Sequence, residues 1–153
     1  MAVRSGEKYI LTFTDTSLLG AGIARLDGLA LFCPGAAAGD TAEVIITEVK
    51  KRYIHARLHR IVTPSPDRCT PDCGIYAECG GCLFRHIRYE TEAKYKEEAV
   101  RGALRHHTSI VWEPIFTASS GEYRNKAVFH LDPQYRAGYY AVSTNTHIDL
   151  PAD

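Results

Sequence analysis

Four cysteines lie within fourteen residues of this 153-residue chain, and this cluster constrains the fold more than any other feature. They are Cys69, Cys73, Cys79 and Cys82. The fifth, Cys33, lies in a separate apolar run, where we expect it to be a small buried hydrophobic side chain. An odd number of cysteines, in a chain that begins without an apolar secretory core, argues against a disulfide framework. The clustered thiols therefore indicate a metal centre in a reducing compartment, the cytoplasm.

The spacing of these cysteines suits two kinds of metal centre. Four local thiolates can complete a tetrahedral zinc site. An iron–sulfur cluster also takes four thiolates, and one of them often comes from far along the chain. Gly80-Gly81 lets the chain wrap tightly and leaves backbone amides free to face the sulfurs. His86 could replace a thiolate at zinc, although a polar histidine that opens a helix is commoner. Spacing alone leaves zinc and iron–sulfur open.

The first 62 residues have the pattern of a small β-barrel. Asp27-Gly28 tolerates the positive φ angles of a tight hairpin, and Pro34-Gly35 and Gly39-Asp40 mark further turns. Short strands separated by glycine-rich turns favour a closed sheet, because closure removes exposed edges. The strand-forming runs cover residues 9–14, 19–26, 29–32, 44–49 and 53–59.

A cationic turn joins the last two of these runs. Lys50, Lys51 and Arg52 occupy the turn, and strand alternation places Tyr53 and Arg57 on the outward face of the run that follows. A small barrel with clustered cations beside an aromatic ring is typical of proteins that bind single-stranded nucleic acid, since phosphates attract the cations and a base stacks on the ring. A solvated hairpin tip is the alternative. The net charge is zero, so such local patches must supply any attraction to nucleic acid.

Helical and strand patterns follow the barrel. Two prolines at 64 and 66 end the last ladder. Apolar residues then recur at helical spacing over 89–104, which predicts one amphipathic helix of roughly five turns. Strand patterns return at 111–116, 127–131 and 137–142. No apolar run approaches the roughly 20 residues of a membrane span, so we expect no membrane association.

Two stretches of the chain resemble known families. The pattern Gly20-x-Gly22-x-Ala24-Arg25-x-Asp27-Gly28, with Phe32, Pro34-Gly35, Gly39-Asp40 and Lys50-Lys51-Arg52-Tyr53, resembles the TRAM domain, an RNA-binding β-barrel. The pattern Cys73-x5-Cys79-Gly80-Gly81-Cys82, followed by His86, Tyr89 and Lys94, is similar to the iron–sulfur motif of the S-adenosylmethionine-dependent RNA uracil-5-methyltransferases that act on 23S rRNA and tRNA. Tyr123-Arg124-Asn125-Lys126 matches the central region of the same family. The resemblance implies a [4Fe-4S] cluster and adds Arg124 and Lys126 to the RNA-binding candidates.

The chain also departs from this family. There the fourth cluster ligand is a distal cysteine after a strand like residues 147–150, and this chain ends about where that cysteine is expected. We therefore hypothesise that Cys69 serves as the fourth thiolate. The family's Rossmann-like domain, with its S-adenosylmethionine site, nucleophilic cysteine and general base, has no counterpart in these residues. We assign no catalytic residue and expect this chain alone to be inactive.

These observations predict a mainly β protein with one amphipathic helix, divided into three parts. Residues 1–65 form a TRAM barrel, 66–107 a cluster-binding loop and helix, and 108–153 the start of a β-rich central domain, cut short. The predicted function is RNA recognition within an RNA (uracil-C5)-methyltransferase acting on rRNA or tRNA, with a second chain as one source of the catalytic domain. The alternatives are a free-standing RNA-binding module with a structural zinc or iron–sulfur site, and a redox or iron sensor.

Overall fold

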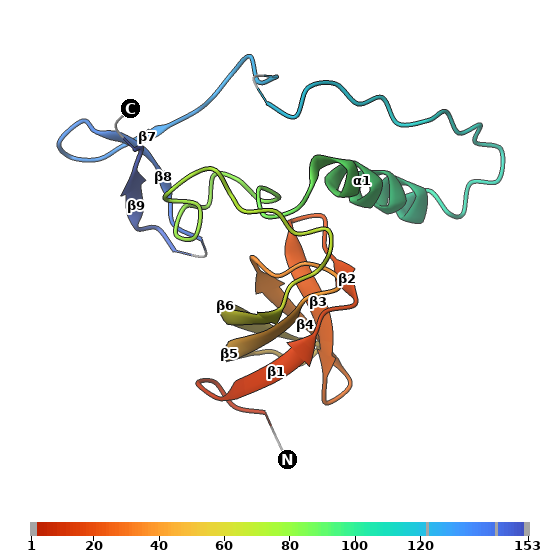
Figure 1. Ribbon diagram of the computed structural model, residues 1–153, viewed down its shortest axis with the longest axis horizontal. Helices are drawn as coiled ribbons and strands as arrows, with labels where there is room; N and C mark the ends of the chain where they lie inside the picture. The colour runs from red at the N-terminus through yellow and green to blue at the C-terminus, as the bar shows by residue number, and fades with distance from the viewer. Residues whose placement is uncertain (1–2, 122, 143, 152–153) are drawn as a thin grey trace.

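The barrel is a curled sheet of six strands in the order β1-β5-β6-β4-β3-β2 (Figure 1). The computed structural model describes residues 3–121, 123–142 and 144–151. Neighbouring strands are antiparallel except for β4 and β6, which are parallel. The strands are β1 (Lys8–Thr12), β2 (Asp15–Thr16), β3 (Ala21–Leu26), β4 (Leu29–Pro34), β5 (Thr41–Val49) and β6 (Tyr53–Thr63).

The two edge strands, β1 and β2, are consecutive in the chain, and this continuity curls the sheet. Phe13 and Thr14 connect them. The Phe13 amide donates to the Asp40 carbonyl at 2.8 Å, while the Thr14 amide donates to the Ile23 carbonyl of β3 at 2.9 Å. One stretch of chain therefore crosses from the β5 side of the sheet to the β3 side. The predicted barrel is confirmed as a barrel-like sheet whose edges are covalently joined.

The core of this sheet follows the predicted alternation along β6. Ile54 and Ala56 are buried and Leu58 is half-buried, whereas Tyr53 and Arg57 face outward. The predicted hairpin is also present, with positive φ at both Asp27 (49°) and Gly28 (78°) between β3 and β4. The buried core is Phe13, Ala24, Leu31, Cys33, Ala36, Ala42, Val44, Ile46, Ile54 and Ala56. Cys33 is thus the buried hydrophobic side chain that its apolar surroundings predicted.

The cysteine segment is an irregular loop with a closed base. The chain entering it pairs antiparallel with the chain leaving it, through a bridge between Arg68 and Ile87. Beside this bridge, the Cys69 amide donates to the His86 carbonyl at 3.1 Å. The Arg88 amide donates to the Asp67 carbonyl at 2.9 Å. Residues 70–85 therefore form a loop whose two ends are held together.

The predicted helix forms as α1 (Tyr89–Ala103), but only its first half has a buried side. Thr91 and Ala93 are buried and Tyr95 packs against the loop, whereas Val100 is 51% exposed. The second half carries an i,i+4 ion pair between Arg101 and Glu97, which suits a solvated helix. Within the described residues, no helix has the length and apolar character needed to cross a membrane.

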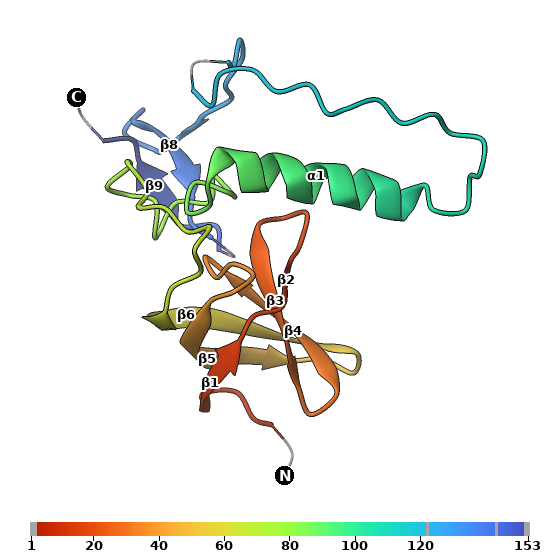
Figure 2. The ribbon, with the colours of Figure 1, turned by 45° about the vertical axis from the view of Figure 1, so that its right-hand side comes forward.

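The last part of the chain forms less sheet than its sequence predicts. A small antiparallel sheet contains β7 (His130–Leu131), β8 (Ala137–Tyr140) and β9 (His147–Asp149). The predicted strand at 111–116 is wrong, and the one at 127–131 begins only at His130. Val111 and Phe116 are 84% and 90% exposed. Figures 1 and 2 show this segment passing α1 as extended chain, without a neighbouring strand to complete a ladder.

Candidate RNA-binding face and metal centre

The three cationic side chains in the turn between β5 and β6 differ in whether they form an ion pair. The Lys50 amide donates to the Tyr53 carbonyl at 2.9 Å and closes the turn. The Lys50 ammonium pairs with Glu48, and this hydrogen bond raises the pKa of Lys50. Lys51 and Arg52 are exposed and take part in none of the ion pairs found in the described part of the chain. Two of the three predicted cations are therefore free to meet a phosphate.

An aromatic cluster lies beside this turn. Tyr53, which is 37% exposed, stands edge-on to His55 at 5.1 Å and to Phe32 at 6.2 Å between ring centroids. The parallel pairing of β4 with β6 aligns Phe32 with His55. Strand alternation already places Tyr53 and His55 on one face, but nothing local in the sequence links them to Phe32 in β4. We call Phe32, Tyr53 and His55 the aromatic triad.

A groove of about 1570 Å³ runs between the outer face of β6, the cysteine loop and the β7–β9 sheet. Arg57 and His59 line it on the barrel side. On the other side the rings of His130 and Tyr140 stack at 4.2 Å. Cys79 and Cys82 line the groove between these walls. Cationic and aromatic side chains thus flank one channel that leads from the barrel to the cysteines.

The environment of the cysteines suits thiolate ligands. The Gly81 amide faces the Cys79 sulfur at 3.4 Å, which is the role predicted for the glycine pair. The Arg85 guanidinium lies 3.8 Å from the Cys82 sulfur, and its hydrogen bonds with Asp72 and then Cys82 raise its pKa. Such N–H donors stabilise negative sulfur in metal sites. These donors and four free thiols in one loop fit a metal centre.

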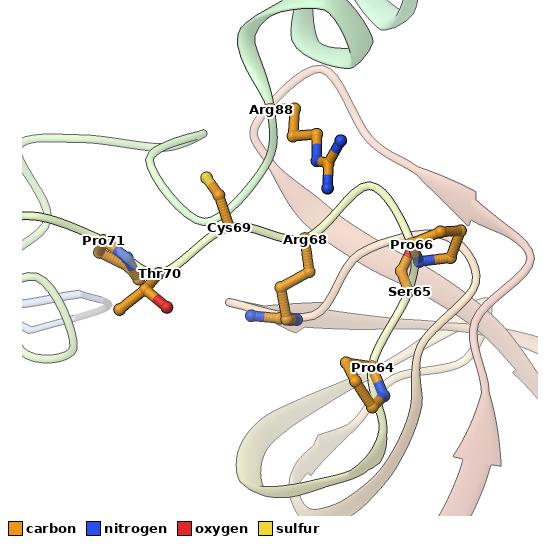
Figure 3. A pocket seen from close by; sticks show the side chains of 8 residues that line it. All are labelled: Pro64, Ser65, Pro66, Arg68, Cys69, Thr70, Pro71 and Arg88. Carbon is orange, nitrogen blue, oxygen red and sulfur yellow. The ribbon is translucent and has the colours of Figure 1, made fainter.

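The other two cysteines of the cluster, Cys69 and Cys73, are both half-buried. The Cys69 thiol donates to the Arg85 carbonyl at 3.5 Å and opens onto a second cavity of about 520 Å³ (Figure 3). The Cys73 carbonyl accepts the Tyr76 amide at 3.1 Å. Among the described residues, no three cysteine sulfurs lie within 4.8 Å of one another. The ligand set and the choice of metal therefore stay predictions.

Gly80-Gly81 also has a packing role that the sequence did not reveal. The Gly80 amide donates to the Tyr140 carbonyl at 2.9 Å, and Cys79 forms a bridge with Ala141. A Cβ on Gly81 would lie 2.9 Å from the Tyr139 ring. The glycine pair therefore lets the loop lie close against the end of β8 and the residue that follows it.

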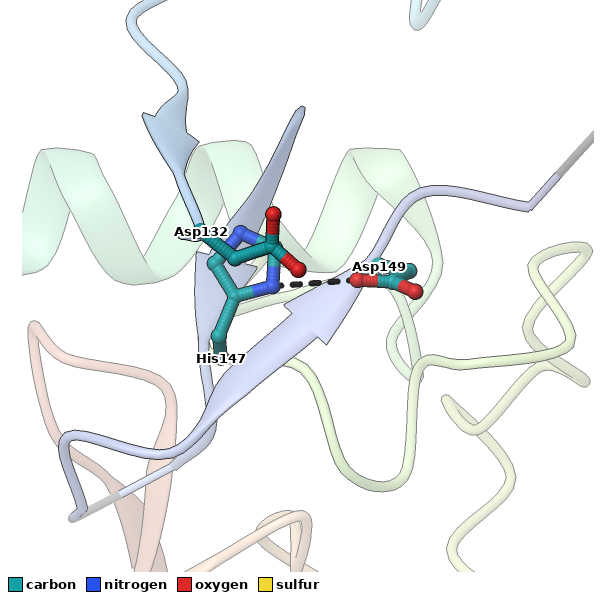
Figure 4. A group of neighbouring side chains, drawn as sticks. All are labelled: Asp132, His147 and Asp149. Carbon is teal, nitrogen blue, oxygen red and sulfur yellow. Dashed lines mark hydrogen bonds and ion pairs between the residues drawn. The ribbon is translucent and has the colours of Figure 1, made fainter. Parts of the chain in front are cut away.

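Within the described residues, one group of three side chains could hold a metal ion by its geometry, and it lies outside the cysteine loop. Asp132, His147 and Asp149 place their ligand atoms within 4.8 Å of one another (Figure 4). Arg136, however, bonds to Asp132 and Asp149, at 2.7 and 2.6 Å. Because one arginine already satisfies both carboxylates, this group is an ion-pair network that ties β9 to the turn after β7.

His86 does not fit the alternative of a zinc ligand. It is 1% exposed, and both ring nitrogens are engaged. Nε2 lies 3.2 Å from the Ala36 carbonyl, which can only accept, so Nε2 carries the proton. Nδ1 then accepts the Tyr76 hydroxyl at 2.6 Å. Burial lowers the pKa of His86 and so favours this neutral form, and burial raises the pKa of Tyr76 to about 12.

Arg124 and Lys126 lie apart from the other RNA-binding candidates. Both are exposed, and Arg124 lies over the Tyr123 ring at 6.0 Å. Figures 1 and 2 place the segment around them on the opposite side of α1 from the barrel. The structure therefore does not bring these two cations to the β5–β6 turn, and their role in RNA binding stays a prediction.

Comparisons with known proteins agree with this architecture. Residues 2–59 match the TRAM domain. An RNA methyltransferase of Halalkalibacterium halodurans is 32% identical over 97% of this chain and 34% of its own length. One from Nostoc is 35% identical over 95% of this chain and 33% of its own length. A 23S rRNA (uracil(1939)-C(5))-methyltransferase of Shewanella amazonensis is 42% identical over 65% of this chain and 22% of its own length.

A TRAM domain followed by a cysteine loop, within a match that covers nearly the whole chain, defines the class of protein. The chain carries a TRAM domain and corresponds to one region of RNA methyltransferases, a family that includes 23S rRNA (uracil(1939)-C(5))-methyltransferases. It spans about a third of the length of the first relatives that it matches.

Proposed function

We propose that this chain is the RNA-binding, metal-carrying region of an RNA (uracil-C5)-methyltransferase that acts on rRNA or tRNA in the cytoplasm. The observation that carries the proposal is the aromatic triad beside the unpaired cations Lys51 and Arg52 on a TRAM barrel. Stacking platforms next to cations bind unpaired nucleotides, because bases stack on the rings while phosphates meet the charges.

The groove supports a path for the bound strand. A strand that stacks on Tyr53 and follows β6 meets Arg57 next and then reaches the space between the barrel and the β7–β9 sheet. The stacked rings of His130 and Tyr140 form the far wall of that space. Unpaired bases can stack on such rings, whereas the bases of a duplex are already stacked on one another. We therefore expect this region to prefer single-stranded or loop RNA.

Cys73, Cys79 and Cys82, with Cys69 as the fourth thiolate, would hold a [4Fe-4S] cluster, and zinc is the alternative. Methyl transfer needs an S-adenosylmethionine site, a nucleophile and a base. We assign none of these to the described residues and place them in sequence that the longer relatives have in addition, on the same chain or on a second one. A free-standing RNA-binding module is the second candidate, favoured by the closed base that ties the cysteine loop together.

Two measurements on the purified chain test these proposals. The first is fluorescence anisotropy with a uridine-containing RNA hairpin and with a duplex of the same length. Tighter binding of the hairpin is expected, and equal affinity for both would contradict the single-strand path. The second is iron, acid-labile sulfide and zinc per chain after anaerobic preparation. Iron and sulfide near four each support the cluster, and zinc near one supports the free-standing module.

A further inference from the structure

A buried joint connects the barrel to the cysteine loop, and its first arm is an ion pair. Asp40, in the turn between β4 and β5, is 0% exposed and bonds to Arg68 at 3.1 and 2.5 Å. Arg68 also donates to the Gly35 carbonyl at 2.7 Å. Burial by itself would raise the pKa of Asp40, but bonds from Arg68 and from the Ser65 and Ala37 amides bring it below its usual value. Arg68 directly precedes Cys69, so this arm fixes the start of the loop.

The second arm is His86, which fixes the end of the loop. Its ring donates to the Ala36 carbonyl of the same barrel turn and accepts from Tyr76, within the loop. Its backbone carbonyl accepts the Cys69 amide at 3.1 Å. Both arms therefore start from one turn of the barrel and meet at Cys69.

Apolar contacts fill the space between the arms. Ala37, from the barrel turn, packs with Phe84 and Ile87, which follow the last cysteine, and Tyr95 of α1 covers them. No buried side-chain nitrogen or oxygen among the described residues lacks a hydrogen-bond partner. A satisfied and packed contact of this kind resists opening, because breaking it would strand buried polar groups.

We propose that this joint orders the cysteine loop before any metal binds, and that His86 is a positioning residue of the metal centre. The purpose of the joint rests on the proposed metal centre, while the ordering itself is a property of the metal-free chain. Many small metal sites fold only when metal arrives, because the loop must lose its conformational freedom at that moment. Here the barrel orders the loop in advance. By linkage, metal bound to the loop stabilises the joint in turn.

The test is alkylation of the metal-free full chain by iodoacetamide under native conditions, with the rate at each cysteine measured by peptide mass spectrometry. Two variants are compared with the wild type. His86→Leu removes both ring hydrogen bonds, and His86→Gln keeps one donor and one acceptor. Cys33, at 0% exposure in the barrel core, is an internal control for unfolding of the barrel.

In His86→Leu we expect alkylation of Cys69 and Cys79 to accelerate about tenfold, a change typical of losing a buried hydrogen bond, with Cys33 unchanged. His86→Gln should restore most of the protection. Equal rates at Cys69 in all three proteins overturn the proposal. A matching acceleration at Cys33 overturns it as well, since His86 would then stabilise the whole barrel.

A titration with cobalt(II), whose visible absorption reports thiolate ligands, gives a second readout. We expect the dissociation constant to rise about tenfold in His86→Leu and to recover in His86→Gln. An unchanged constant in His86→Leu overturns the positioning role. Wild type that shows no thiolate band and takes up neither zinc nor iron refutes the metal centre itself, whereas His86-dependent protection of the thiols would still support the ordering by the joint.

Discussion

The barrel and the last third of the chain contain similar strand-forming runs but differ in how much sheet they form. In the barrel, β5 pairs with both β1 and β6 over long ladders. Beyond α1, the run at 111–116 has no partner strand in the described structure and is exposed, and β7 has two residues. Strand propensity mostly measures how well a side chain fits neighbouring strands. A run without neighbours therefore stays extended and solvated.

The largest expected effect would test this comparison directly. Phe13→Ala should lower the free energy of unfolding by about 3–5 kcal/mol, because Phe13 is 1% exposed in the barrel core. Phe116→Ala, the matched change in the exposed segment, should alter it by less than about 0.5 kcal/mol. Urea denaturation followed by circular dichroism measures both. A comparable loss in the two variants would show that residues 111–116 are packed in solution.

Next in size is the buried ion pair of the joint. Asp40→Asn should lower the free energy of unfolding by about 3 kcal/mol, because it leaves Arg68 without its counter-charge in a mostly buried site. Glu43→Gln, which breaks the more exposed pair with Arg60, is the control and should lower the free energy of unfolding much less, because solvent screens that pair.

The same ion pair predicts a pH dependence. The folded-state pKa of Asp40 lies below its usual value, so its contribution to stability is fully present above about pH 4 and is lost as pH falls through the folded pKa. Urea titrations between pH 7 and pH 3 should show this loss in wild type. If the free energy of unfolding of Asp40→Asn fell equally steeply with falling pH, the acid sensitivity would belong to other carboxylates.

A smaller effect is expected for RNA binding at the aromatic triad. Tyr53→Ala should weaken binding of a single-stranded RNA by about 1–3 kcal/mol, the usual value of one base–aromatic stack. Tyr135→Ala, at an exposed tyrosine beyond the barrel, should leave the affinity unchanged. Fluorescence anisotropy at fixed salt measures the RNA affinity of both variants. An equal loss of affinity in the two would mean that the RNA does not bind preferentially to the barrel face.

The smallest effect concerns one phosphate contact. Lys51→Ala or Arg52→Ala should weaken binding modestly and reduce the slope of log K against log salt by about 0.7, the value for one phosphate on a single strand. Lys50→Ala should do less, because Lys50 is already paired with Glu48. Unchanged affinity and slope in the Lys51 and Arg52 variants would show that the turn is only a solvated hairpin tip.

Much of the barrel was predictable, because its turns and the alternation of its strands depend on residues that are neighbours in the sequence. The Asp27-Gly28 hairpin and the alternation along β6 follow from two-residue periodicity and turn chemistry. The clustering of four cysteines in one loop is also visible in the sequence. The strand at 111–116 was predicted wrongly for the opposite reason, since its pattern lacks the neighbour that would make it a strand.

The sequence by itself determined the TRAM-type barrel, the helix, the cationic turn and the clustering of thiols, because each depends on residues that lie near one another along the chain. Only the tertiary structure decided that Phe32 joins Tyr53, that Gly81 lies against Tyr139, and that His86 bonds to the barrel instead of standing free as a ligand. These contacts join residues that are far apart in sequence, and they exist because buried polar groups and apolar faces must find partners wherever the fold places them.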